Sequence, residues 1–243
     1  VELVPVALRL FMEYIEQLPV KSRALPHLKW MMATGEAVTV DLVNAWLTLY
    51  PDIPVVNAYG PTEAADDVIQ CVIKRKLPLQ QLPVPIGKPL PNLRVFILDD
   101  LMRLVPAGVA GEICISGVGV GEGYWKNPGK TAESFLPNPF SQTTGDKLYK
   151  TGDLGRWLAD GSVEYIGRLD NQVNVSGFRV ELGEVESVLS AQPRVSESVV
   201  MVRDDMDDGG TLVAYITGTI GGRSPDAYGL RRELRAVLPE YMV

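Results

Sequence analysis

Residues 57–63, Asn-Ala-Tyr-Gly-Pro-Thr-Glu, combine side chains that could hold a nucleotide with a backbone setting that suits one. They follow a short β-branched run and precede residues 64–69, which are predicted to open a helix, and the start of a helix is a natural phosphate site. Thr62 offers a hydroxyl to a phosphate oxygen, Glu63 offers a hard oxygen ligand to Mg²⁺, and Tyr59 offers an aromatic face to a base. The stretch therefore predicts a nucleotide-binding turn.

A purely structural interpretation of the same stretch is also open. Thr62 would then cap a helix, and the acidic residues Glu63, Asp66 and Asp67 would favour the positive end of that helix. The residue types alone do not separate the two interpretations.

Other candidate motifs fail on spacing. Residues 117–123 are rich in glycine but do not fit GxGxxG, and they run into Tyr124 rather than a helix. Gly129-Lys130-Thr131 is similar to the end of a P-loop, yet Tyr124 stands where the first glycine is required. Residues 203–210 lack the spacing of a calcium loop. His27, the only histidine, argues against a Ser-His-Asp triad and the usual zinc sites.

Composition limits the class of protein. With 23 Lys and Arg against 30 Asp and Glu, the net charge is −7, and we expect no nucleic-acid partner. The 46% hydrophobic content is ordinary for a globular chain. No uncharged apolar run is long enough to cross a membrane, so we expect no membrane partner. The two cysteines, Cys71 and Cys114, are too far apart in sequence for a CxxC pair, which favours a reducing compartment and a cytoplasmic location. We also expect the chain to be a piece of a longer protein, because it has neither an initiator Met nor a signal peptide.

The elements that must position these residues are predicted from periodicity. Apolar residues at a spacing of four, Val6, Leu10, Tyr14 and Leu18, predict a helix over 4–18. A strand over 28–32, a helix over 38–50 capped by Thr39, and a strand over 53–57 follow, an order that favours parallel pairing.

From about Val84 onward, the sequence pattern is typical of short strands separated by Gly and Pro. We expect a small β-barrel or sandwich over about 84–169, with a hairpin turn at 159–161. Its strands are expected at 94–98, 111–116, 148–150, 155–158 and 163–166.

A compact α+β unit is predicted after Gly167. Phe178, Leu182, Val185 and Leu189 mark one helical face. Two strands, 198–202 and 212–217, follow, and a last helix is expected to open at Ser224-Pro225 with Leu230, Leu234 and Val237 inward. We place the domain boundary near Asp170, which gives domains of 1–169 and 170–243.

Several further stretches stand in a recognisable order with 57–63. They are residues 111–117 leading to 123–125, 149–154, 167–173, 177–186 and 238–242. Together they resemble the ordered motifs of adenylate-forming enzymes, most closely the amino-acid adenylation domains of nonribosomal peptide synthetases. The resemblance implies the fold: the end of a large N-terminal domain, with a parallel sheet, helices and a small β-barrel, followed by a small α+β domain.

The resemblance also implies a reaction. A carboxylate and MgATP give an acyl-adenylate and pyrophosphate, and the acyl group then passes to a phosphopantetheine thiol on a carrier domain. The ATP-binding residues it implies are Gly35, Glu36, Ala37, Asn57, Ala58, Tyr59, Gly60, Thr62, Asp153, Tyr165 and Arg168. Thr62 and Glu63 would be catalytic, with Glu63 holding Mg²⁺, and Asp153 would accept hydrogen bonds from both ribose hydroxyls. The alternatives are that Asp153 is a turn residue and Arg168 a surface partner for a carboxylate.

Asp170 falls where the family has its hinge, between adenylation and thiolation arrangements of the small domain. Asn174 and Ser176 stand where the family commonly has Lys and Arg, which puts the acyl transfer or the carrier contacts in question. The family's phosphate-binding loop lies upstream of Val1 and its C-terminal lysine beyond Val243. We therefore expect the chain alone to be inactive, and a non-catalytic binding module is one alternative.

The implied side-chain pocket consists of Met32, Thr34, Ala58, Asp66 and Asp67. Its carboxylates favour a polar or cationic amino acid, unless one or both of them point to solvent. Expected partners are the amino-acid substrate, a peptidyl carrier domain, neighbouring synthetase domains and an MbtH-like activator. An acyl-CoA ligase is the close alternative, although residues 57–63 and 170–173 favour the peptide-synthetase branch.

Overall fold

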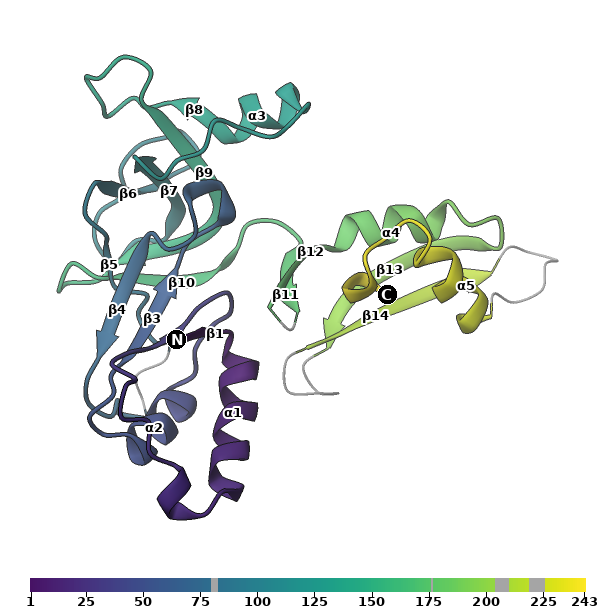
Figure 1. Ribbon diagram of the computed structural model, residues 1–243. Helices are drawn as coiled ribbons and strands as arrows, with labels where there is room; N and C mark the ends of the chain where they lie inside the picture. The colour runs from purple at the N-terminus through teal and green to yellow at the C-terminus, as the bar shows by residue number, and fades with distance from the viewer. Residues whose placement is uncertain (80–82, 176, 204–209, 219–225) are drawn as a thin grey trace. The chain divides into compact units, whose positions relative to one another are not determined.

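The computed structural model describes the chain except for residues 80–82, 176, 204–209 and 219–225 (Figure 1). The chain divides into two units, Val1–Leu169 and Asp170–Val243. Unit 1 contains two sheets, and unit 2 contains two strand pairs with helices. Among the described residues, no helix has both the length and the apolar character needed to span a bilayer.

The first sheet of unit 1 is mixed. Its strands, in spatial order, are β1 (Glu2–Leu3), β2 (Met31–Ala33), β3 (Val55–Tyr59), β4 (Ile69–Ile73) and β5 (Lys88–Pro89). β1, β2 and β3 pair in parallel, which confirms the parallel pairing expected around the second helix. β3–β4 and β4–β5 are antiparallel. The carboxyl ends of β2 and β3 therefore lie at one edge of the sheet.

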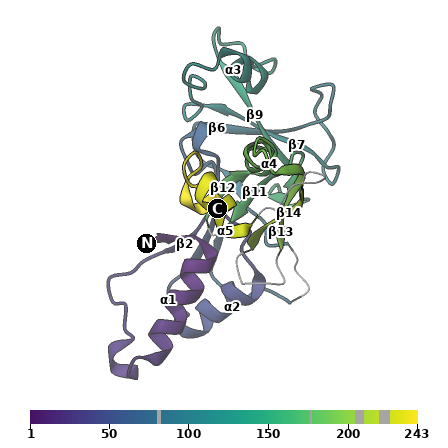
Figure 2. The same ribbon diagram turned by 90° about the vertical axis from the view of Figure 1, so that its right-hand side faces the viewer.

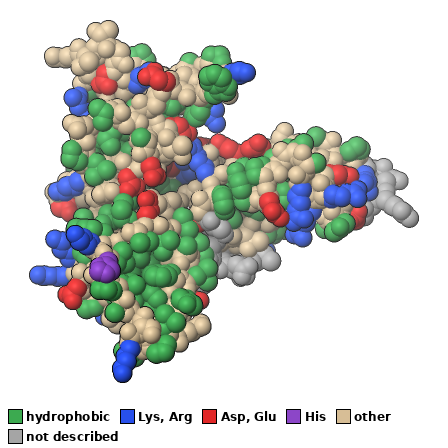
Figure 3. All heavy atoms as spheres, viewed as in Figure 1, with side chains coloured by type: hydrophobic (Ala, Val, Ile, Leu, Met, Phe, Trp, Pro, Cys, Tyr) green, Lys and Arg blue, Asp and Glu red, His purple; other side chains and the backbone are tan. Residues whose placement is uncertain are grey.

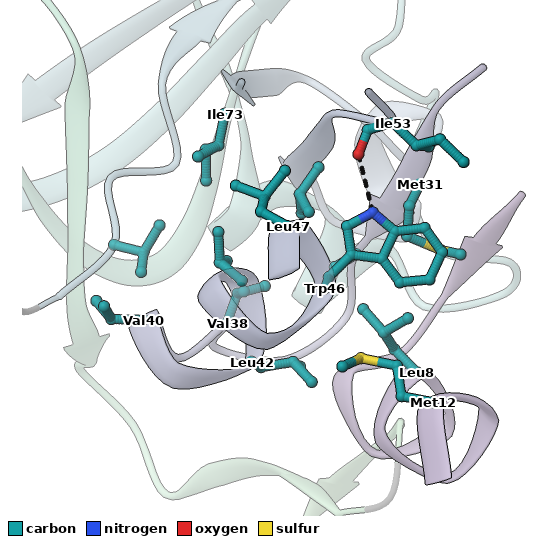
Figure 4. Close-up of a cluster of buried hydrophobic side chains, with 14 residues drawn as sticks. Leu8, Met12, Met31, Val38, Val40, Leu42, Trp46, Leu47, Ile53 and Ile73 are labelled. Atoms are coloured by element: carbon teal, nitrogen blue, oxygen red, sulfur yellow. Dashed lines mark hydrogen bonds between the residues drawn. The ribbon is translucent and has the colours of Figure 1, made fainter. Parts of the chain in front are cut away.

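Two helices lie side by side beside this sheet (Figures 1 and 2). α2 (Val40–Leu49) begins at Thr39, whose Oγ1 accepts from the Leu42 N–H at 3.3 Å, as the sequence predicts. It ends before Pro51, since the residue preceding a proline disfavours the helical conformation. Trp46 is fully buried, and its indole N–H donates to the Ile53 carbonyl at 2.9 Å (Figure 4).

α1 (Pro5–Gln17) confirms the predicted helix but not the face that it buries. Leu8, Met12 and Ile15 point into the core, whereas Leu10 and Tyr14 are 61% and 59% exposed. Apolar residues lie on two faces of this helix. A four-residue spacing therefore predicts a helix but does not indicate which of the two faces packs on the sheet. Apolar side chains consequently gather on the surface over α1 (Figure 3).

The second sheet is antiparallel. Its main path runs β10 (Val163–Arg168), β9 (Lys147–Trp157), β7 (Gly111–Gly117) and β6 (Leu93–Leu98), and β8 (Phe135–Pro137), which follows α3 (Pro128–Ser134), also pairs with β9. The predicted hairpin at 159–161 joins β9 to β10, with Gly161 at φ +75°. The two strands predicted at 148–150 and 155–158 are the single long strand β9.

The prediction of a β-barrel is wrong for the described residues, because this sheet is open. Other segments contact one end of each outer strand. The Val163 N–H of β10 donates to the Gly87 carbonyl at 2.6 Å, and the Val105 N–H donates to the Ile97 carbonyl of β6 at 3.1 Å. Closure would require β6 and β10 to pair with each other, and these contacts take its place.

In its described residues, unit 2 contains two antiparallel hairpins, two α-helices and a short 3₁₀ turn at Glu240–Met242 around its own core. The elements are β11 (Gln172–Val175), β12 (Phe178–Glu181), α4 (Leu182–Ser190), β13 (Val195–Arg203), β14 (Thr211–Gly218) and α5 (Ala227–Leu234). The buried cluster consists of Val175, Val180, Val185, Leu189, Val200, Leu234, Leu238 and Met242.

Two predictions for unit 2 are wrong, and a third concerns residues outside the described ranges. Phe178 belongs to β12 rather than to a helix and is 49% exposed, because 178–181 pair with β11. Val237 is exposed and Leu238 takes its place in the core, since α5 ends at Leu234. The expected cap at Ser224-Pro225 lies outside the described residues. Asp226 caps α5, accepting from the Gly229 N–H at 2.7 Å.

Candidate active site

The candidate site lies at the edge of the first sheet where β2 and β3 end. Thr34 and the predicted 35–37 stretch follow β2, and residues 60–63 follow β3. Because these two strands are parallel, both loops leave the sheet at the same edge, which is the usual ligand edge of such sheets. The topology therefore brings two of the sequence-predicted stretches together.

The turn after β3 differs from the prediction. Thr62–Ala64 is a single 3₁₀ turn rather than the start of an α-helix, and Thr62 does not cap it. The chain must return at once to pair β4 with β3, with Ile69 opposite Tyr59, so no length remains for a helix. The phosphate argument from a helix N-terminus and the capping interpretation are therefore both wrong, and Thr62 and Glu63 stand on a tight turn.

Gly60 makes this turn possible. A Cβ at this position would overlap the carbonyl oxygen of Asp66, so the two ends of the turn approach closely only because residue 60 is glycine. Ala65 and Asp66 then adopt the left-handed conformation, with φ of 60° and 70°. The turn is held in one shape by its backbone.

The Glu63 carboxylate is held by a neighbouring segment. Tyr124 Oη donates to Glu63 Oε1 at 2.7 Å, and the Gly121 N–H donates to the Glu63 carbonyl at 2.9 Å. Mg²⁺ prefers carboxylate oxygens and commonly takes only one or two of them, with phosphate and water completing the shell. The donor chemistry of Glu63 fits such an ion.

Asp153 is the centre of the most tightly bonded part of the site. Its Oδ2 accepts from Tyr59 Oη at 2.5 Å, and its Oδ1 accepts from Arg168 Nη1 at 2.8 Å. The side chains of Asp153 and Arg168 are only 10% and 16% exposed. Asp153 lies within β9 and not in a turn, and Arg168 is not a surface residue, so both structural alternatives from the sequence are wrong.

Two β-bulges aim Asp153 and Arg168 at each other. On β9 the register against β7 shifts between Glu112 and Cys114, and Gly152 there has φ +74°. On β10 the register shifts between Tyr165 and Gly167, after which Arg168 stands opposite Asp153. A bulge re-aims the side chains that follow it. The ion pair is thus built by the backbone of both strands.

The charge of Asp153 affects the neighbouring tyrosine. Burial of the Tyr59 hydroxyl and the adjacent Asp153 carboxylate raise the pKa of Tyr59 well above its ordinary value of 10. Tyr59 therefore stays protonated at neutral pH and remains a hydrogen-bond donor. The ring of Tyr165 lies 6.1 Å from that of Tyr59, centroid to centroid, tilted by 39°.

The other residues predicted to line the adenine differ in their burial and in their contacts. Asn57 is 3% exposed, and its Nδ2 donates to the Pro85 carbonyl at 3.0 Å, an interaction that fastens β3 to a neighbouring segment. Ala58 is buried in the same strand. Gly35 is exposed with φ +81°, and Glu36 and Ala37 continue its loop. Their roles toward adenine remain predictions.

An acidic cluster occupies part of the predicted side-chain pocket. Carboxylate oxygens of Glu2, Asp66 and Asp67 lie within 4.8 Å of one another. Thr34 Oγ1 donates to Asp67 Oδ1 at 3.5 Å and Gln70 Nε2 donates to Asp67 Oδ2 at 2.9 Å. Burial and neighbouring carboxylates raise the pKa of Asp67 and that of Glu2. Asp66 is exposed, whereas Asp67 and the predicted pocket residue Met32 are half-buried.

Unit 2 carries the residues expected to act after adenylation. Asp170 is its first residue, and Asp170 Oδ1 accepts from the Gln172 N–H at 3.1 Å. Asn174 is exposed on β11, opposite Arg179 of β12. Ser176 lies outside the described residues.

Three residues of the site were missed in the sequence. Thr151 is buried, and its Oγ1 accepts from the Asp153 N–H at 3.0 Å. Tyr124 stands in the 123–125 motif, but the motif does not indicate that its hydroxyl contacts Glu63. Glu2 lies on a strand too short for a periodic signal, although parallel pairing sets it opposite Met32. Thr151 stands within the 149–154 motif, so proximity to Asp153 could have identified it.

Comparison with known proteins defines the class. A family model described as AMP-binding enzyme matches residues 1–125, just over half of the chain. The chain therefore belongs to the AMP-binding enzyme family. The expected resemblance to adenylate-forming enzymes is confirmed at this level.

More particular similarities are to peptide synthetases. Tyrocidine synthase 2 of Brevibacillus parabrevis is 42% identical over 213 residues, which cover 88% of this chain and 6% of that protein. Phosphinothricin tripeptide synthetase PhsC of Streptomyces viridochromogenes is 43% identical over 219 residues, 90% of this chain and 19% of that protein. The chain thus spans less than a fifth of either relative.

A solved structure shares the fold. NpsA-ThdA, an artificially fused adenylation–PCP di-domain synthetase from Klebsiella oxytoca, matches with a TM-score of 0.81 and 25% identity, covering 100% of this chain and 43% of that one. The expected fold class, part of an adenylate-forming domain with a small α+β unit, is confirmed apart from the closed barrel.

Proposed function

We propose that this chain is part of an adenylation domain that activates an amino acid with MgATP as aminoacyl-AMP and passes it to the phosphopantetheine thiol of a carrier domain. The observation that carries the proposal is the Asp153 carboxylate, held between Tyr59 and Arg168 beside the turn that bears Glu63. A carboxylate fixed on two sides is pre-organised to accept hydrogen bonds from a ribose diol. The family membership supports the same assignment.

Each residue of the proposed nucleotide site has a distinct task. Asp153 accepts from the ribose hydroxyls, while Tyr59 and Arg168 keep its carboxylate in place. Thr62, exposed on the turn, offers its hydroxyl to a phosphate oxygen. Glu63 holds Mg²⁺, which neutralises phosphate charge when bound. The loop of Gly35, Glu36 and Ala37 lies along adenine.

We further propose that the amino-acid side chain binds among Met32, Thr34, Ala58, Asp66 and Asp67. Burial raises the pKa of Asp67 and the Asp66 carboxylate adds to this shift, so a cationic or polar side chain there would be favoured. Asp67→Asn is expected to shift the substrate preference away from basic and polar amino acids. An unchanged preference would contradict the pocket assignment.

The second half-reaction requires partners. We propose that Asp170 is the hinge about which the small unit exchanges adenylation for thiolation, since a hinge needs only a few residues that absorb backbone rotation. The partners are a peptidyl carrier domain, neighbouring synthetase domains and an MbtH-like activator, all in the cytoplasm. The similarity to peptide synthetases supports a carrier partner.

The test is amino-acid-dependent exchange of labelled pyrophosphate into ATP by the full-length protein, with co-expressed activator, across a full panel of amino acids that includes arginine, lysine, glutamine and leucine. Exchange with one or a few of these amino acids, preferably basic or polar ones, is the expected result. Absence of exchange with every amino acid, in a folded protein that still binds ATP, would contradict amino-acid activation.

A further inference from the structure

The segment 117–124, called here the glycine loop, fits no phosphate-binding motif, yet it packs directly on the turn that carries Glu63. The Gly121 N–H donates to the Glu63 carbonyl at 2.9 Å. A Cβ at Gly119 would lie 2.7 Å from the Ala64 carbonyl oxygen, and one at Gly121 would lie 3.2 Å from the Glu63 carbonyl oxygen. Small residues are thus required where the loop meets the turn.

Tyr124, at the end of the glycine loop, reaches the Glu63 side chain. Its hydroxyl donates to Glu63 Oε1 at 2.7 Å. A hydrogen bond to a carboxylate is stronger than one between neutral groups, and it removes rotational freedom from the acceptor. One oxygen of Glu63 is therefore fixed in direction before any ligand arrives.

The tyrosine ring is itself held in place. The Tyr124 N–H donates to Thr131 Oγ1 at 2.9 Å, and Thr131 Oγ1 in turn donates to the Asn127 carbonyl at 2.8 Å. The Phe135 ring meets the Tyr124 ring edge-on at 5.4 Å between centroids. Lys130 Nζ lies 5.3 Å from the centroid of the Tyr124 ring, a cation–π distance. These contacts fix the position of the Tyr124 ring and hence of the hydroxyl that donates to Glu63.

We propose that Tyr124 is a positioning residue that sets the Glu63 carboxylate for a divalent cation, and that the glycine loop is the brace that carries it. The proposal rests on the proposed function, in which Glu63 holds Mg²⁺. Carboxylates that ligate metals are themselves commonly hydrogen-bonded by outer groups, and loss of such a group typically costs about 10- to 100-fold in metal affinity. Tyr124 has the donor, the distance and the support for this task.

The competing explanation is that this hydrogen bond serves stability alone, and a matched variant separates the two. Tyr50 Oη donates to the Arg23 carbonyl at 2.8 Å in a similarly half-buried setting, outside the candidate site. Tyr50→Phe and Tyr124→Phe each remove the hydroxyl with the hydrogen bond that it donates, and both keep the ring. Both variants should lose some stability, and Tyr124→Phe should lose more because its acceptor is a carboxylate. Only Tyr124→Phe should also lower the affinity for a divalent cation.

The experiment measures Mn²⁺ binding to the full-length protein by electron paramagnetic resonance, in the presence of a saturating non-hydrolysable ATP analogue. Tyr124→Phe is expected to raise the Kd of Mn²⁺ about 10-fold, with wild-type Kd in Tyr50→Phe. In pyrophosphate exchange, the Mg²⁺ concentration for half-maximal rate should rise by a similar factor, and the rate should recover at high Mg²⁺. A rate that recovers at high Mg²⁺ distinguishes a positioning role of Tyr124 from a loss of folded protein.

The outcomes are separable. Wild-type Mn²⁺ affinity in Tyr124→Phe would overturn the positioning role and leave the proposed function intact. Absence of nucleotide-dependent Mn²⁺ binding in the unsubstituted protein would overturn the proposed function itself. If Tyr124→Phe does not fold, Gly121→Ala replaces it, because it keeps every side chain of the contact while its Cβ presses on the Glu63 carbonyl. Gly121→Ala should also weaken Mn²⁺ binding. Unchanged Mn²⁺ binding in this variant would contradict the proposed role of the glycine loop.

Discussion

Asp153 and Asp67 are two carboxylates of unit 1 with opposite electrostatic environments. Asp153 is nearly buried and pairs with Arg168 at 2.8 Å. Asp67 is half-buried, accepts from the neutral groups of Thr34 and Gln70, and lies beside other acids. The protein balances the charge of Asp153 with its own guanidinium, whereas the described donors to Asp67 are the neutral groups of Thr34 and Gln70. The first carboxylate suits a neutral diol, and the second suits a cation.

The largest expected effect is that of Asp153→Ala. The substitution leaves the mostly buried Arg168 guanidinium without its carboxylate, and breaking a buried pair from one side costs about 3 kcal/mol or more. We expect the free energy of unfolding in urea to fall by about 3 kcal/mol and nucleotide binding to be lost.

A double variant sharpens this prediction. Asp153→Ala combined with Arg168→Met removes both charges and should recover part of the lost stability, because no buried cation remains uncompensated. Nucleotide binding should not recover. Equal losses of stability in the single and double variants would show that the pair is not electrostatically important.

Tyr59→Phe should have the next largest effect. It deletes one hydrogen bond to Asp153 while keeping the ring against Tyr165, and a hydrogen bond to a charged group contributes about 1.5–3 kcal/mol. Calorimetric unfolding should show a loss near the lower end of that range, since Arg168 still holds the carboxylate. A loss as large as that of Asp153→Ala would mean that the ring has moved.

Asp67→Asn tests the other side of the comparison through pH. The folded-state pKa of Asp67 is raised above its ordinary value of 3.8, so ionisation opposes folding, and the penalty is absent below that value and complete once pH exceeds the folded pKa. We expect the variant to be more stable than the unsubstituted chain at pH 7, and the advantage to disappear as pH falls below about 3.8. Denaturant unfolding at several pH values measures both. An advantage that persists in acid would point to packing instead.

The smallest structural effect is expected from Asn174→Lys. Residue 174 is exposed, so stability should change by less than about 0.5 kcal/mol. We expect unchanged adenylation and an altered rate of acyl transfer to the carrier, measured separately by pyrophosphate exchange and by loading of labelled amino acid. Equal changes in both rates would contradict a role confined to the second step.

Features decided by residues close together in the sequence could be predicted from it, whereas features decided by contacts between distant residues could not. Local signals were sufficient for the Thr39 cap and for the hairpin at 159–161, because neighbouring residues decide both. The turn after β3 was predicted as a helix, since residues 64–69 do not reveal that β4 must pair with β3. The burial of Arg168 depends on two bulges in different strands, and periodicity does not report a bulge. The acidic cluster required the pairing of β1 with β2.

The long strand β9 has a consequence for the timing of motions. It pairs with β7 along one side and with β8 and β10 along the other, and the amides of Gly152 and Asp153 at its bulge donate to the side chains of Glu112 and Thr151. Local opening that spares the rest of the sheet cannot release them, and exchange of these amides with deuterium should require the cooperative opening of unit 1. Asp153, within this strand, therefore belongs to the part of unit 1 expected to open last.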